Sequence, residues 1–166
     1  RTITVHNFAV ATVGEDGKYE DSNKHIVVVC QALRGVAFML RVLRRSAVGK
    51  RPIIVLCNFT PSNAVEDQAA MREIYAHREK GLGHIFVWEG VHKSMLERAK
   101  LDQASMVIIL AGERASHIEA LKEGVKLSDI LDDEVMSTSI DILALIDPNS
   151  TRVVVELMDD VHIYEF

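Results

Sequence analysis

Five short runs of aliphatic residues, spread along the chain, constrain its fold more than any other feature of the sequence. Each run is rich in valine and isoleucine and lacks the polar alternation of a half-exposed strand. Continuous apolar runs of this length are typical of parallel strands that are covered on both faces. The predicted strands are Ile26–Cys30, Ile53–Cys57, Ile85–Trp88, Met106–Leu110 and Val153–Leu157.

Stretches with helical periodicity separate these strands. In the first of them, Val36, Met39, Leu40 and Leu43 recur at a spacing that places them together on a helix. Strands that alternate with helices predict right-handed βαβ crossovers. We therefore expect an α/β fold with a Rossmann-like, doubly wound, mostly parallel sheet in a single lobe. The predicted helices are Gly35–Ala47, Ser62–Lys80, Lys93–Ala99 and Asp133–Ile146.

Two segments do not fit this alternation. Residues 1–22 are β-prone and turn-rich, which predicts an extra strand or a connector that precedes a lobe at residues 23–166. Residues 112–131 separate the fourth strand from the next helix by far more than the usual two to six residues. We interpret residues 112–131 as an insertion, within which Ser116–Val125 could form a short helix.

The composition excludes several classes of protein. The chain has 166 residues, 26% of them charged, and a net charge of −5, which gives no support to a nucleic-acid-binding surface. No apolar run is long enough for a membrane span, so we expect no direct membrane insertion of this chain. Cys30 and Cys57 each end a predicted buried strand, which favours reduced, packed thiols over a disulfide. We expect the chain to be an excised piece of a longer protein.

The segment HIVVVCQALRG predicts a strand that leads directly into a helix, where dinucleotide-binding domains hold a pyrophosphate. The three glycines of G-x-G-x-x-G would fall on Cys30, Ala32 and Gly35, and only the last is glycine. The second strand ends in Asn58 instead of the acidic residue that binds the ribose of NAD. The sequence therefore disfavours ordinary NAD binding, although a smaller nucleotide could use the same cleft.

The candidate cleft is the set of residues that follow the carboxyl ends of the predicted strands. Its polar members could contact a ligand. In the alternative interpretation, Gln31 and Arg34 lie in an exposed turn and Gly35 serves only the packing of the helix on the strand. The candidate residues are Cys30, Gln31, Ala32, Arg34, Gly35, Asn58, Glu89, Gly90 and Glu113.

Several segments together resemble the N-terminal lobe of an RCK domain, also called TrkA-N. They are HIVVVCQALRG, IIVLCN, FVWEGVHKSMLERAKLDQASMVIILA and TRVVVELMDD, and they span residues 24–160. In the third, Glu89-Gly90-Val91 takes the family's turn and Leu96-Glu97-Arg98-Ala99 its Leu-x-x-Ala helix end. The long insertion is most similar to the first RCK domain of Slo-type potassium channels or their prokaryotic relatives.

The resemblance implies a cytosolic ligand-sensing regulatory domain of a potassium channel or transporter, not an enzyme. RCK domains form homo-oligomers, as dimers or as a gating ring beneath a membrane pore domain, and they couple ligand binding to pore opening. A domain of this kind would lie at the cytoplasmic side of the cell membrane. Two alternatives remain open: an NAD(P)- or nucleotide-binding soluble sensor or enzyme, and a degenerate assembly module without a ligand.

Four acidic residues at the end of the insertion are a candidate metal site. Slo-like domains carry carboxylates implicated in calcium sensing in this region, and calcium prefers several carboxylate oxygens on a flexible backbone. The alternative is the start of a helix, where acidic side chains favour the positive end of the helix dipole. The candidate residues are Asp129, Asp132, Asp133 and Glu134.

Overall fold

A computed structural model describes most of the chain from His25 onward. The described residues are 25–34, 36–44, 51–58, 64–79, 84–112, 117–122, 124–147 and 149–158. The predicted connector at residues 1–22 lies outside them.

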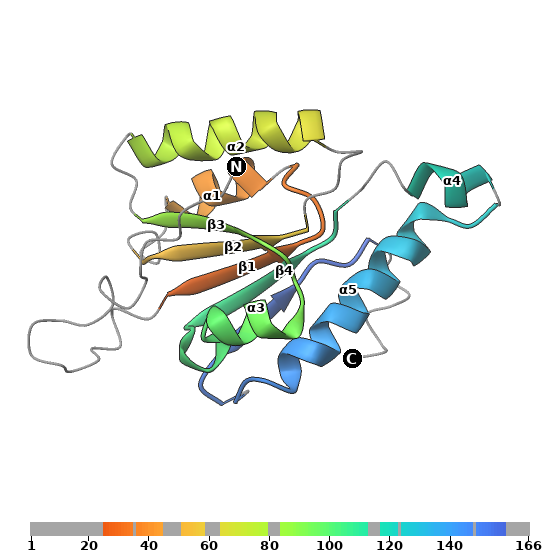
Figure 1. The fold of residues 1–166 in the computed structure, drawn as a ribbon. Coiled ribbons are helices and arrows are strands. Elements are labelled where there is room, and N and C mark those ends of the chain that lie inside the picture. The colour runs from red at the N-terminus through yellow and green to blue at the C-terminus, as the bar shows by residue number, and fades with distance from the viewer. Residues whose placement is uncertain are drawn as a thin grey trace, which may run out of the picture.

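The described residues contain a five-stranded, fully parallel sheet in the order β3-β2-β1-β4-β5 (Figure 1). β1 lies at its centre and pairs in register with both neighbours, so that Val28 is level with Val55 of β2 and Ile108 of β4. This order confirms the doubly wound α/β fold. The strands are β1 (Ile26–Cys30), β2 (Ile53–Cys57), β3 (Ile85–Glu89), β4 (Met106–Leu110) and β5 (Arg152–Val155).

Helices cover both faces of the sheet. Helices α1 and α2 lie on one face, and α3 and α5 lie on the other (Figure 1). A short 3-10 helix, Leu101–Gln103, leads into β4. The helices are α1 (Val36–Arg44), α2 (Ala64–Glu79), α3 (Lys93–Arg98), α4 (His117–Lys122) and α5 (Leu127–Leu143).

The continuous apolar strands follow from this layering, because successive side chains of a strand point to opposite faces. In β1, Val27 and Val29 pack against the α3 and α5 side, whereas Ile26, Val28 and Cys30 pack against α1 and α2. All five residues of β1 are at most 1% exposed. Burial of each such side chain stabilises the fold by about 1.5–3 kcal/mol, so the central strand could not carry a polar alternation.

The end of the predicted insertion is helical instead of a loop. Helix α5 begins at Leu127, after Lys126 in an extended conformation, six residues before the expected start at Asp133. The four candidate acidic residues therefore lie within the first eight residues of a helix. The short helix expected within Ser116–Val125 is present as α4.

His25 fixes the amino edge of the central strand. Its ring Nε2–H donates to the carbonyl oxygen of Ala99 at 2.7 Å, and its own carbonyl accepts the Ser105 N–H at 2.9 Å. The residue is fully buried. Burial lowers the pKa of His25 below its ordinary value of 6.5, and the nearby Lys100 acts in the same direction, whereas the bond to Ala99 partly offsets them.

We expect this histidine to make the protein less stable in mild acid. Below about pH 6.5 the unfolded chain binds a proton at His25 that the folded chain resists, so the free energy of unfolding falls as the pH falls. The slope from this one group reaches about 1.4 kcal/mol per pH unit at most. Urea unfolding at several pH values between 5 and 8, compared with His25→Gln, measures it. The exposed His84, replaced by Gln, is the control, and equal slopes in all three proteins would contradict the expectation.

Candidate functional site

The direction of winding reverses between β1 and β4, where the chain crosses from the edge at β3 back to the centre of the sheet. Doubly wound sheets bind their ligands outside the carboxyl ends of the strands, beside such a switch point. The carboxyl ends of β1 and β4 flank this switch point, and those of β2 and β3 lie next to them along the same edge of the sheet.

Asn58 links the ends of β1, β2 and β3. It directly follows β2, and its side-chain amide Nδ2 donates to Gln31 Oε1, after β1, at 3.1 Å. Its Oδ1 accepts the backbone N–H of Val91, after β3, at 3.1 Å. The structure thus brings Gln31, Asn58 and the Gly90–Val91 turn together, as the sequence led us to expect, and the side chain of Asn58 bridges them.

Gly90 has a conformation that a side chain would strain. Its φ is +106°, and its N–H donates to the carbonyl of Cys57 at 2.8 Å. A Cβ at this position would come within 3.0 Å of Nε2 of His92, so the imidazole lies against the glycine. The neighbouring Glu89 is exposed and points its charge to solvent. The glycine is buried, because the side chains of His92 and Met95 cover the turn beside Asn58.

The crevice between β1 and β4 is closed by a contact between two backbones. A Cβ on Gly112, just after β4, would lie 2.7 Å from the backbone nitrogen of Ala32. The space bounded by Cys30, Leu110 and Thr138 has no room for a water molecule. Gly112 was not among the predicted cleft residues, although a glycine so soon after a predicted strand can indicate the close approach of another backbone.

The loop after β1 is also held from α2. The backbone N–H of Leu33 donates to Oδ1 of Asp67 at 3.4 Å, and Asp67 is only 5% exposed. Ala32 is buried and Arg34 is exposed, which suits the interpretation of Arg34 as part of a surface turn. Asp67 was not among the expected site residues, because only the packing of α2 brings it to this loop.

The two cysteines among the cleft candidates are packed in the core. Cys30 and Cys57 are level with each other on β1 and β2, fully buried, and not joined by a disulfide. Their thiols point to backbone carbonyls, of Leu56 at 3.6 Å and of Asn58 at 3.8 Å. Gly35 and Glu113 lie outside the described residues.

The four candidate metal ligands point in different directions. Asp132 is fully buried and accepts the Met158 N–H at 2.7 Å, whereas Asp133 is exposed. Glu134 lies 3.3 Å from Nε2 of the buried His117 on α4. Only Asp129 is in the first turn of α5, so the dipole explanation applies to it alone. Within the described ranges, no group of three or more such side chains could hold a metal ion.

Comparisons with known proteins give no family for this chain. No protein-family model matches it, and none of the curated proteins matches it. Among solved structures, it is similar to a universal stress protein determined in complex with cAMP. The two chains are 18% identical with a TM-score of 0.40, and the match covers 82% of this chain and 99% of the other. A likeness this slight carries no functional argument.

The expected kinship with the RCK family was wrong. No family model supports it, and a solved structure to which the chain is similar is a universal stress protein, not an RCK domain. The quoted segments are explained by the fold, because Leu96 and Ala99 of the Leu-x-x-Ala helix end are core residues under the sheet. Regulation of a potassium channel through a gating ring was inferred from that kinship alone and is withdrawn with it. In the described part of the chain, no helix is long and apolar enough to cross a membrane.

Proposed function

We propose that this chain is a nucleotide-binding regulatory domain without catalytic activity, and that its ligand lies across the carboxyl ends of β1, β2 and β3. The observation that carries the proposal is the position of Asn58. Its side chain follows β2, where dinucleotide-binding folds place the group that holds the ribose, and it connects to the two neighbouring strand ends.

The hydrogen-bonding capacity left at Asn58 suits a ribose. One hydrogen of its amide goes to Gln31 and one lone pair of its carbonyl goes to Val91. A primary amide has a second hydrogen and a second lone pair. A pair of ribose hydroxyls can use both, without the charge that an aspartate would add.

The closed crevice favours a mononucleotide over NAD. A pyrophosphate would have to pass between the loop after β1 and the end of β4, where Gly112 and the Ala32 nitrogen already touch. A ligand with a single nucleoside can lie over β1, β2 and β3 without entering that space.

The side chains near Asn58 support binding without catalysis. The hydroxyl of Ser94 and Nδ1 of His92 are 2.9 Å apart, the separation of a nucleophile and its base. Both residues are exposed, however, and the other ring nitrogen of His92 lies against Gly90 instead of a carboxylate. A triad needs a third group that orients the base, and Gly90 cannot provide one.

Replacement of Asn58 by leucine should weaken nucleotide binding about tenfold or more, because the ligand loses one or two hydrogen bonds in a partly buried site. Isothermal titration calorimetry with AMP, cAMP, ATP and NAD measures this. The matched control is Gln68→Leu, which removes an exposed amide on α2. Flat traces for all four ligands would refute the proposal, and binding of NAD as tight as that of AMP would refute the preference for a mononucleotide.

A further inference from the structure

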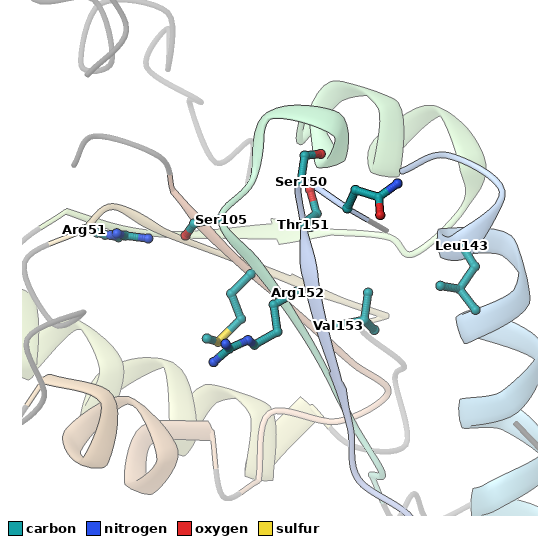
Figure 2. Close-up of a pocket in the computed structure, with 9 residues that line it drawn as sticks. Arg51, Ser105, Leu143, Ser150, Thr151, Arg152 and Val153 are labelled. Atoms are coloured by element: carbon teal, nitrogen blue, oxygen red, sulfur yellow. The ribbon is translucent and has the colours of Figure 1, made fainter. Parts of the chain in front are cut away.

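Strand β5 lies at the edge of the sheet and is covered on one face only. Among the strands that the structure describes, β4 is its sole neighbour. Val153 and Val155 pack against the core on the α3 and α5 side. Arg152, Val154 and Glu156 alternate with them, so they point to the other face, where all three are exposed. Figure 2 shows Val153 directed toward α5 and Arg152 directed away from it.

The backbone of β5 presents hydrogen-bonding groups on its outer side. The N–H of Glu156 donates to the carbonyl of Ile109 in β4 at 2.9 Å, and the N–H of Arg152 donates to the residue just before β4. The N–H and C=O groups of Val153 and Val155, which alternate with these residues, therefore point away from β4. A strand edge of this kind is a template for pairing with another strand.

The charges at the two ends of β5 complement each other. Arg152 and Glu156 are both two residues from Val154, one on each side. In an antiparallel pair of β5 strands with a two-fold axis at Val154, Arg152 of each copy is opposite Glu156 of the other. Opposite charges at directly opposed positions stabilise a strand pair. Among the described residues, neither side chain is in a salt bridge within its own chain.

The charge pattern selects one register. With the axis at Val154, the outward groups of Val153 face those of Val155 in the second copy, which makes hydrogen-bonded pairs. An axis at Val153 or at Val155 would keep backbone bonds but place one of the two charges opposite Val154. Parallel pairing in register would place like charges side by side, which is unfavourable. The antiparallel pair about a two-fold axis is also closed, so it ends at two copies.

Apolar side chains of α5 extend the surface beside β5. Ile140 is 65% exposed and Leu143 is 43% exposed, and they share one flank of the helix because they are three residues apart. Leu143 lines the same hollow as Arg152 and Val153, so this flank lies on the side of the edge strand (Figure 2). A two-fold axis at β5 brings the same flank of a second copy to face it. The pairing would then cover apolar surface as well as the strand edge.

We propose that two copies of this chain form a dimer through antiparallel pairing of their β5 strands about a two-fold axis at Val154. The two parallel sheets then join into one continuous sheet, with α5 of both copies on the same face. The partner is a second copy because the charge pattern of β5 complements itself. The inference does not depend on the nucleotide site, because Asn58 follows β2 and is not part of this interface.

Sedimentation equilibrium of the full chain over a range of concentrations tests the dimer. Arg152→Glu and Glu156→Arg should each raise its dissociation constant about tenfold, because both cross-strand charge pairs become repulsive. The two substitutions combined place opposite charges together again and should restore the original constant. Arg72→Glu makes the same change of charge at an exposed position of α2 and should leave the constant unchanged. Thermal melting verifies that all variants fold.

A cross-link locates the two-fold axis. Val154→Cys should give a disulfide-linked dimer on mild oxidation with diamide, because residues of a non-hydrogen-bonded antiparallel pair have Cα atoms about 4.5 Å apart, within the reach of a disulfide. Val65→Cys, at a position on α2 that is 77% exposed, should cross-link far more slowly. A chain that stays monomeric at all concentrations would overturn the proposal, as would a dimer that neither charge reversal weakens. A double variant as weak as the single variants would also overturn it, because Arg152 and Glu156 would then not be opposite each other.

Discussion

Gly112→Ala should lower the free energy of unfolding by about 3 kcal/mol, the upper part of the range for overpacked sites. The added Cβ would lie 2.7 Å from the backbone nitrogen of Ala32, and neither backbone can swing aside as a flexible side chain could. The strain falls where β1 and β4, the two central neighbours of the sheet, diverge. Urea unfolding measures the loss.

Two further variants identify the cause of that loss. Gly124→Ala adds a methyl group where nothing lies within 4 Å, so only its φ of +84° should matter, at about 1–2 kcal/mol. Ala32→Gly combined with Gly112→Ala removes the methyl–methyl contact at 3.3 Å but keeps the contact with the nitrogen. The double variant should therefore stay unstable. A Gly112→Ala protein of normal stability would mean that the crevice is open and could admit a pyrophosphate.

Asp132→Ala should destabilise the protein by about 2–3 kcal/mol. This carboxylate is fully buried in α5 and accepts the N–H of Met158 at 2.7 Å, which ties the chain after β5 back to the helix. Removal of the acceptor leaves that N–H without its partner and loses a hydrogen bond to a charged group. The midpoint of urea unfolding reports the change.

The adjacent residue is the matched control for Asp132. Asp133 is exposed, so Asp133→Ala should change the free energy of unfolding by less than about 0.5 kcal/mol. Asp132→Asn keeps an acceptor oxygen and should recover about half of the loss. Equal effects of the alanine variants at the two positions would show that charge in this helix matters, and not the bond to Met158.

The strands were predictable because a strand that is buried on both faces is a short, continuous run of aliphatic residues. Three of the five strands have the predicted bounds, and the others differ by one or two residues. The start of α5 was not predictable in the same way. Its first two turns contain Asp129, Asp132 and Asp133, an acidic stretch that resembles a loop until Asp132 is seen to be buried.

The sequence predicted the location of the candidate cleft but not the contacts within it. Parallel strands place their carboxyl ends along one edge, so the residues that follow them had to lie near each other. Which of them touch was a matter of side-chain geometry, and Asn58 became the centre because its amide spans the gap between Gln31 and Val91. The four acidic residues shared a sequence segment yet did not share a site, since their side chains leave α5 in different directions.

The sequence by itself determined the doubly wound sheet, because aliphatic runs and helical periods are local patterns that only one layered arrangement can bury. The missing glycines at Cys30 and Ala32 also indicated that the phosphate crevice had changed. The tertiary structure alone decided how that crevice is closed, by the approach of Gly112 to Ala32. Gly112 and Ala32 are 80 positions apart in the chain, so no local pattern encodes their approach.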